Sequence, residues 1–340
     1  MVDIEAVRVD RASFDALCER VEGMGSGPPG VSARVRTGTW SALLLENPFV
    51  GVSVPSRVWL AHAPAGVVGW LLGVPFRGCG AGQALAGHWG VDLFVEPAYR
   101  GRGVGTALLR AWRDMSPLAL GLGITDDAFR LELSLGWRAV PLPPRLVLAL
   151  TPRGFLSARG RGGLAWRGMC GRRGGDGAEV TVSSTLPRGI DDLYRAVAPT
   201  WPFHVSRTEA AVRWRYGRGG ENFTWIALRR HGVLTAVAVV KVDVTRWRKK
   251  LWIHELLVDA ATKDARYLVA ECVRMAQLQG VDLIETRITA KRLRAVLIAA
   301  GFRVGRPSDR FIVHATDPDM ENLAPWKQEW HLTLGDSGNL

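Results

Sequence analysis

The sequence predicts an α+β fold that is built twice in tandem. Elements of the same type follow one another in the same order in both halves, and matching residues recur at a nearly constant spacing. Trp59 and Trp225 are 166 residues apart, and Trp89 and Trp252 are 163 residues apart. A hydrophobic content of 47% with 22% charged residues is typical of a globular protein. We therefore expect two copies of one domain.

Each half is expected to open with a strand and a helix, which are followed by a hairpin. The strand patterns begin at Ile4 and Glu179, and the helix patterns SFDALCERV and GIDDLYRAV follow them. Residues 58–74 and 224–240 each contain two β-rich runs that are separated by a short polar turn. This pattern predicts an antiparallel hairpin in both halves.

The second part of each half is expected to alternate strands with helices. The apolar runs HWGVDLFV (88–95) and LWIHELLV (251–258) predict strands, and amphipathic helices follow both. Gly136 and Gly301, which are 165 residues apart, each follow a helix pattern and precede a short strand pattern. The order of elements is therefore the same to the end of both copies.

These patterns predict four segments. They are an N-terminal domain at 1–150, a Gly/Arg-rich linker at 151–176, a C-terminal domain at 177–316 and a tail at 317–340. The linker has no sustained period, which favours a linker or surface loop, with an RGG-like nucleic-acid segment as the alternative. The tail is expected to be a separate surface element.

The composition narrows the class of protein. No apolar run reaches the length of about 20 residues that spans a bilayer, and the N-terminus lacks the apolar stretch of a secretory signal. The four cysteines are far apart in sequence, which argues against a zinc site and predicts a cytoplasmic protein without a metal. The net charge of +12 favours an anionic ligand, either nucleic acid or a phosphate-bearing cofactor.

The stretch RGRGVG at 100–105 lies between a strand pattern and a helix pattern. The first N–H groups of a helix have no partner inside the helix, and together with the helix dipole they attract anions. Glycine lets the backbone approach such an anion closely. The stretch lacks the Lys-Ser/Thr of a Walker A loop and the spacing of a Rossmann loop. We therefore predict a phosphate-binding loop of another kind.

The stretch resembles the acetyl-CoA motif R/Q-x-x-G-x-G/A of the GNAT superfamily of N-acetyltransferases. LFVEPAYRGRGVGTALL resembles the strand, loop and helix of that family, and SLGW at 134–137 resembles its later LGF element. The resemblance implies two tandem GNAT-like domains, each a mixed, mostly antiparallel sheet flanked by helices. It also implies acetyl-CoA as the co-substrate, bound by Leu93, Phe94, Val95, Arg100, Gly101, Arg102, Gly103, Val104, Gly105 and Thr106.

The second copy departs from this motif. The residues that align with the loop are Lys263, Asp264, Ala265, Arg266, Tyr267 and Leu268, and none of them is glycine. Larger side chains stand where the phosphates would approach, and the aspartate adds charge repulsion. The second copy is therefore interpreted as degenerate and is not expected to bind acetyl-CoA.

Acetyl transfer to an amine requires a base and a proton donor. Members of the resembled family use a carboxylate or an ordered water on the strand before the loop as base. The candidates here are Asp92, His88, which is expected at the surface, and Glu255, which aligns with Asp92 in the second copy. The tyrosine that precedes the family's LGF element is absent, and Glu132 stands in its place.

The sequence thus favours an acetyl-CoA-dependent N-acyltransferase that acts on an amine of a small molecule. The alternative is an inactive acyl-CoA-binding sensor or scaffold, because the usual tyrosine is absent and the second copy is degenerate. The expected partners are acetyl-CoA and the amine acceptor, with no nucleic acid and no membrane. A homodimer is one assembly that the sequence allows.

Overall fold

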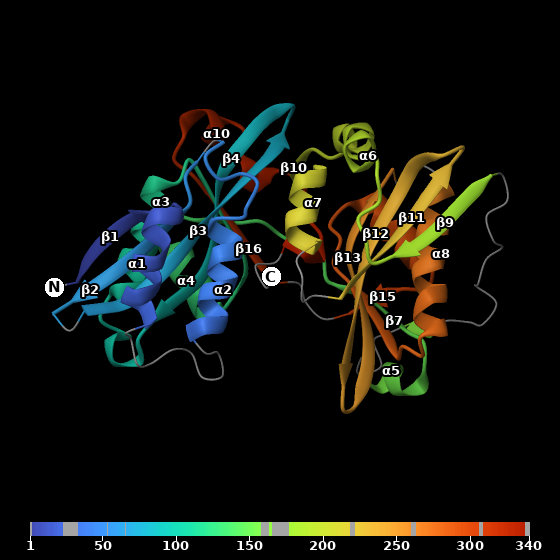
Figure 1. The fold of residues 1–340 in the computed structure, drawn as a ribbon, viewed down its shortest axis with the longest axis horizontal. Helices are drawn as coiled ribbons and strands as arrows, with labels where there is room; N and C mark the ends of the chain where they lie inside the picture. Colours follow the sequence, from blue (N-terminus) through green and yellow to red (C-terminus); the bar gives the residue numbers. More distant parts are fainter. Residues whose placement is uncertain are drawn as a thin grey trace. The chain divides into compact units, whose positions relative to one another are not determined.

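The computed structural model describes residues 2–22, 33–52, 54–64, 66–157, 163–164, 177–217, 222–259, 263–305 and 309–336. The chain forms two compact units (Figure 1). The first unit contains residues 1–141 and 309–328, and the second contains residues 142–308 and 329–337. Both units therefore combine segments that are far apart in the sequence.

The first unit is built on a sheet with the strand order β1-β2-β3-β4-β5-β16-β6. Its pairings are antiparallel except for the parallel pair β4–β5. The strands are β1 (Asp3–Arg8), β2 (Arg57–Ala63), β3 (Gly66–Gly80), β4 (Gln83–Val95), β5 (Leu118–Ile124), β6 (Arg138–Ala139) and β16 (Arg310–Ala315). The helices are α1 (Arg11–Glu22), α2 (Ala33–Leu44), η1 (Pro97–Tyr99), α3 (Val104–Met115), α4 (Asp126–Ser134), α10 (Pro318–Asn322) and η4 (Pro325–Lys327).

The second unit repeats this plan with the strand order β9-β11-β12-β13-β14-β7-β15. Its strands are β7 (Leu146–Ala149), β8 (Gly163–Leu164), β9 (Ala178–Ser183), β10 (Phe203–Val205), β11 (Phe223–Arg230), β12 (Val233–Thr245), β13 (Arg248–Val258), β14 (Leu283–Thr286), β15 (Arg303–Val304) and β17 (Trp330–His331). Its helices are α5 (Pro152–Ser157), α6 (Ile190–Val197), η3 (Ala198–Thr200), α7 (Glu209–Tyr216), α8 (Lys263–Leu278), α9 (Lys291–Ala299) and η5 (Leu334–Asp336).

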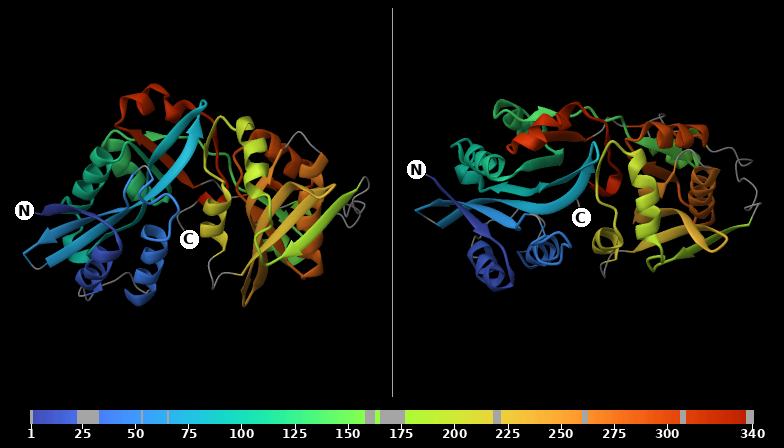
Figure 2. Two further views of the ribbon diagram at one scale, coloured as in Figure 1. Left: turned by 45° about the horizontal axis from the view of Figure 1, so that its top comes forward. Right: turned by 90° about the horizontal axis from the view of Figure 1, so that it is seen from above.

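The main paths of the two sheets have the same order of strands, but β16 from the second half of the chain joins the first sheet and β7 from the first half joins the second. Strand β16 pairs with β5 and β6 in the first sheet, whereas β7 pairs with β14 and β15 in the second. The colours of Figures 1 and 2 show this exchange, because red β16 lies in the sheet of blue and green strands. The compact units therefore differ from the domains expected at 1–150 and 177–316. Both exchanged strands are apolar, so either could fill the same place in a sheet that is buried on both faces.

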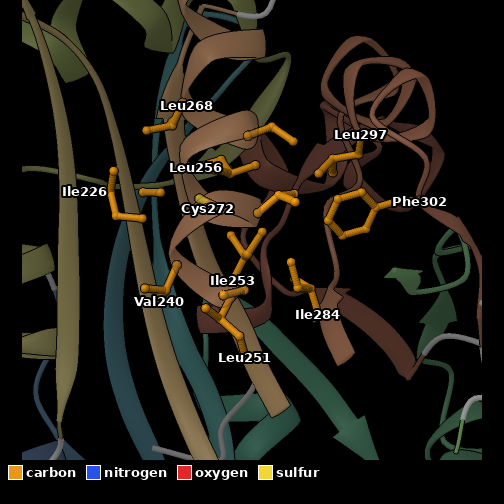
Figure 3. Close-up of a cluster of buried hydrophobic side chains, with 14 of the residues drawn as sticks. Ile226, Val240, Leu251, Ile253, Leu256, Leu268, Cys272, Ile284, Leu297 and Phe302 are labelled. Carbon is orange, nitrogen blue, oxygen red and sulfur yellow. The ribbon is translucent and has the colours of Figure 1, made fainter. Parts of the chain in front are cut away.

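Apolar side chains cover both faces of the second sheet. Ile226 and Leu228 of β11 belong to the cluster that includes α8 and α9, which Figure 3 shows in close-up. Trp225 and Ala227 of the same strand belong to the cluster that includes α6 and α7. Successive residues of a strand point to opposite faces, so this uninterrupted apolar run predicts a strand buried on both sides.

In the first unit, α3 packs against the sheet. Leu108, Leu109 and Trp112 of this helix form one cluster with Trp59 of β2. The helix can approach the sheet closely because a Cβ at Gly90 of β4 would lie only 2.4 Å from the Trp112 ring. This packing places the N-terminus of α3 at the end of β4, where the glycine loop lies.

One expectation from the sequence is wrong. The tail is not a surface element throughout, because Trp330, His331, Leu332 and Thr333 are at most 2% exposed. The segment expected as a linker contains secondary structure at its start, where residues 152–157 form α5 and residues 163–164 pair with β7. Residues 158–162 and 165–176 of the expected linker lie outside the described residues.

Within the described ranges, no helix is both long enough and apolar enough to cross a membrane. The same ranges contain no group of three or more His, Cys, Asp or Glu side chains that could hold a metal ion.

Candidate functional site

The glycine loop, residues 100–105, forms an open cradle at the N-terminus of α3. Gly103 is the residue that precedes the helix, and its φ of 82° lies in the left-handed region, as does the φ of 75° at Gly101. A Cβ placed on either glycine would meet no atom within 4 Å, so open space lies over the backbone. No side chain of the described residues caps the helix start. The first N–H groups of a helix have no partner inside the helix, and such groups can bind an anion.

The two loop arginines have different positions. The Arg100 Nε donates a hydrogen bond to the Val95 carbonyl at 3.0 Å, which ties the loop to the end of β4. The Arg102 guanidinium lies 5.5 Å from the centre of the Tyr99 ring, within the range of a cation–π contact. Both arginines are exposed, and they add positive charge to the cradle.

The pairing of β4 with β5 ends well before the cradle. The parallel ladder between these strands joins only His88 to Ala119 and Trp89 to Leu120, although β4 continues to Val95. Beyond Trp89 the two strands diverge. Leu93 and Val95 remain partly accessible, whereas Phe94 is buried and stacks on Trp70 with ring centres 4.4 Å apart. Residues 93–95, beyond the part of β4 that pairs with β5, thus lead to the glycine loop.

Asp92 lies at a bulge in β4, where two indole groups hold its carboxylate. The Nε1–H groups of Trp40 and Trp70 donate to Oδ2 at 2.9 and 3.2 Å. Asp92 has a φ of 52°, which is strained for a residue with a side chain and is maintained only when the surroundings enforce it. The register of the β3–β4 ladder shifts at the same place. The sequence suggested Asp92 but did not reveal the two tryptophans, because Trp40 lies 52 residues away.

His88 is buried rather than exposed, so the expectation of a surface residue is wrong. Its Nε2 lies 2.9 Å from the Pro55 carbonyl, which can only accept, and its Nδ1 lies 3.0 Å from the Ser116 hydroxyl. The ring is therefore protonated on Nε2 and accepts at Nδ1. Burial lowers the pKa of His88 to about 4, so the ring is neutral at pH 7. Both nitrogens are engaged in structural bonds, and we do not assign His88 a catalytic role.

Glu132 lies in α4, four residues before Gly136, and is 2% exposed. Its Oε2 has no hydrogen-bond partner among the described residues. Burial raises the pKa of Glu132 to about 8. The side chain is therefore mainly protonated at neutral pH and can act as a hydrogen-bond or proton donor.

This shift predicts a pH-dependent effect of Glu132→Gln. Between pH 4.5 and 8 the folded protein binds a proton at Glu132 that the unfolded chain releases, so wild-type stability falls as the pH rises through this window. The glutamine of the variant does not titrate, so it removes this pH dependence of the stability. We expect the stability of the variant relative to wild type to increase by on the order of 3 kcal/mol from pH 5 to pH 8. Urea unfolding of the wild type and the variant at pH 5 and pH 8 measures this change in relative stability.

Glu321→Gln is the matched control, because Glu321 is exposed in the same unit. The control should follow the wild-type pH profile. If the Glu132→Gln profile also runs parallel to wild type, the pKa of Glu132 is not raised.

Among the residues that the structure describes, the second unit shows no equivalent of the glycine cradle. Lys263 to Leu268, which the sequence aligned with the loop, form the first turns of α8 instead. Asp264 in the first turn of this helix is 4% exposed and accepts from the Arg230 Nε at 2.7 Å. A carboxylate of the protein therefore occupies the favourable position for an anion at this helix start.

The chain's own tail fills the gap between β13 and β14. Thr333 pairs with Ile288, just after β14, and its hydroxyl donates to Glu255 of β13 at 3.2 Å. A Cβ at Gly335 would lie 3.3 Å from the His254 carbonyl of β13. The strand end of β13 is buried, in contrast to the partly accessible end of β4.

Glu255, the second-copy candidate, belongs to a buried ionic cluster rather than to an open site. It is 1% exposed and accepts from the Arg207 Nε at 2.8 Å. Arg207 also forms an ion pair with Asp336, which pairs in turn with Arg215 at 2.9 Å. Burial opposes ionisation of Asp336, but Arg207 and Arg215 hold its pKa below the usual range. Two guanidinium and two carboxylate groups thus balance one another, and the arrangement indicates a structural role for Glu255.

Comparison with known proteins agrees with this architecture. Residues 55–135 match the family model described as an acetyltransferase (GNAT) domain. Among the curated proteins, a search finds no match.

Solved structures resemble nearly the whole chain. A GCN5-related N-acetyltransferase from Anabaena variabilis is 14% identical with a TM-score of 0.60, and the match covers 92% of this chain and 72% of that one. A probable N-acyltransferase from Enterococcus faecalis is 11% identical with a TM-score of 0.62, covering 93% and 73%. A tandem GNAT protein from the clavulanic acid biosynthesis pathway is 16% identical with a TM-score of 0.50, covering 93% and 99%. The predicted tandem GNAT fold is confirmed.

Proposed function

We propose that this chain, which has the tandem GNAT fold of acyl-CoA-dependent acyltransferases, transfers an acetyl group from acetyl-CoA to an amine of a small molecule. The observation that carries the proposal is the cradle at the N-terminus of α3. Gly101 and Gly103 leave open space over the loop backbone, and the end of β4, beyond its ladder with β5, leads to them.

Each part of this site has a proposed role. The backbone of 100–106, including Val104, Gly105 and Thr106, would bind the pyrophosphate of acetyl-CoA, and the arginines would add charge attraction. The edge of β4 at residues 93–95 would bind the extended pantetheine arm. The fit is supported by the empty space where side chains would otherwise stand. We assign one acetyl-CoA to each chain, because the tail fills the corresponding gap in the second unit.

The transfer needs an amine without its proton and a proton for the leaving thiolate. We propose that Asp92 accepts a proton from the amine as the nitrogen attacks the thioester carbon. The C–N bond forms, the C–S bond breaks, and the thiolate takes up a proton. Asp92 is suited to this role because the indole donors of Trp40 and Trp70 fix its carboxylate. Glu132, which is mainly protonated at neutral pH, is our candidate for the proton donor.

Calorimetry of acetyl-CoA binding to the full chain, followed by a thiol-release assay with a panel of small amines, tests the function. We expect micromolar binding at one site per chain and thiol release with at least one class of amine. Binding without thiol release for any amine would support the alternative of an acyl-CoA sensor or scaffold. The absence of binding would overturn both assignments.

Asp92→Asn tests the proposed base. Asparagine retains an oxygen that can accept from the two indoles, but it cannot take up the proton. We expect kcat to fall about a hundredfold while the dissociation constant of acetyl-CoA stays unchanged. An unchanged kcat would remove Asp92 from the mechanism. If the variant also lost affinity for acetyl-CoA, Asp92 would instead be assigned a role in shaping the acetyl-CoA site.

A further inference from the structure

The second unit contains a cavity of about 450 Å³, which lies in the size range of small-molecule sites. Segments from four parts of the chain line it. They are the end of η3, the residue that follows β13, the start of α9 and the tail, which contribute Thr200, Trp201, Pro202, Asp259, Ala290, Lys291, Arg292, Leu293, Glu329, Trp330 and His331. The proposed acetyltransferase site does not use these residues.

The start of α9 supplies a positive end to the cavity. Ala290 precedes the helix, and no side chain in the described part of the chain caps it. The unpaired N–H groups and the helix dipole give this end a partial charge of about +0.5. Arg292 in the first turn is exposed and forms no ion pair with the described residues.

His331 is a second and independent indication of a ligand. His331 is one of the residues that line the cavity and is 2% exposed, yet neither ring nitrogen has a hydrogen-bond partner among the described residues. The ring stacks on Trp201 at 3.8 Å with an interplanar angle of 4°, which fixes its orientation. A buried polar group without a partner costs about 1–3 kcal/mol. A bound molecule that pairs with the imidazole would recover this cost.

The imidazole and the helix start lie in neighbouring parts of the backbone. The Thr289 N–H donates to the Leu332 carbonyl at 3.0 Å, so the tail runs alongside the segment that leads into α9. His331 and Ala290 are the next residues along these two paired segments. Burial holds the pKa of His331 well below its ordinary value, so the ring is neutral and one nitrogen carries an N–H donor.

The charges in the wall favour an anion at this end. Lys291 pairs with Glu329 at 2.9 Å, so these two charges compensate each other. Asp259 and Arg292 also line the cavity and carry one charge of each sign. The partial charge of the helix start then leaves a net positive balance of about half a unit.

We propose that this cavity binds a small organic anion, a carboxylate or a phosphate ester, whose anionic group lies at the start of α9 between Arg292 and His331. The buried indoles of Trp201 and Trp330 line the same cavity and provide an apolar wall for the body of the ligand. This ligand is distinct from acetyl-CoA, which we assign to the first unit.

Calorimetry on the full chain with phenyl phosphate, phenylacetate and benzyl alcohol tests the proposal. We expect one of the two anions to bind at one site per chain, and the stronger of the two identifies the preferred anionic group. Benzyl alcohol, which has the apolar body without the charge, should bind at least tenfold more weakly. Equal binding of the alcohol, or no binding of either anion, would overturn the proposal.

Three variants locate the site. Arg292→Glu and His331→Phe should each weaken binding of the preferred anion at least tenfold, and phenylalanine preserves the stack on Trp201. Arg266→Glu makes the same charge change on the exposed face of α8 outside the cavity and should leave binding unchanged. Wild-type affinity in the first two variants would overturn the assignment. A second acetyl-CoA site that Arg292→Glu removes would also overturn it, because the ligand would then be the cofactor.

Discussion

Gly103→Trp is expected to weaken acetyl-CoA binding about a thousandfold, from the micromolar to the millimolar range. Gly103 precedes α3 with a φ of 82°, and the space over its backbone is open. An indole at this position would fill the cradle that the pyrophosphate requires and would push the backbone out of the left-handed region, which is costly for residues other than glycine. Calorimetry of the full chain measures the loss.

The variant Gly82→Trp separates the steric effect from general backbone strain. Gly82 lies in the turn between β3 and β4 of the same unit, has a φ of 80° and is equally open to solvent. It should lose a similar amount of stability but retain acetyl-CoA affinity. If Gly103→Trp binds acetyl-CoA as tightly as Gly82→Trp does, the cradle is not the cofactor site.

The glycine loop could be predicted from the sequence because its signals are local. A strand pattern, left-handed glycines and a helix start follow one another within about 25 residues, and each depends only on its neighbours. The duplicated order of hairpins and helices could be recognised for the same reason. The position of Asp92 on β4 followed from the strand pattern as well.

The exchange of strands could not be predicted in this way. The runs at 146–149 and 310–315 are both apolar and short, so their patterns fit either sheet equally well. The pairing of β7 with β14 joins residues more than 130 positions apart. Periodicity carries no information about which of two equivalent sheets such a strand enters.

The role of the tail was missed because its partners are also remote. In the sequence, Asp336 lies in a polar stretch. Such a stretch is typical of an exposed segment. Asp336 is buried because Arg207, 129 residues earlier, and Arg215 neutralise its charge. Buried ionic groups violate the usual separation of apolar and charged residues, so they are detected only when the partner is known.

Arg207→Ala is expected to destabilise the second unit by about 3–5 kcal/mol. Arg207 is fully buried and donates to Glu255, Asp336 and the Val205 carbonyl. Its removal would leave two buried carboxylates with Arg215 as the remaining guanidinium of the cluster. Because these carboxylates can be neutralised by protonation, the destabilisation should be smaller at pH 5 than at pH 8.

Arg213→Ala provides the matched control for this prediction. Arg213 lies on α7 and pairs with Glu209 at 2.6 Å, but its side chain is 62% exposed. Water solvates both partners, so the loss should stay below about 1 kcal/mol. Urea unfolding of both variants at the two pH values distinguishes the cases. An equal and small loss in both variants would show that the cluster does not anchor the tail. A large loss confined to Arg207→Ala would support the conclusion that a buried charge network holds the tail against β13 and β14.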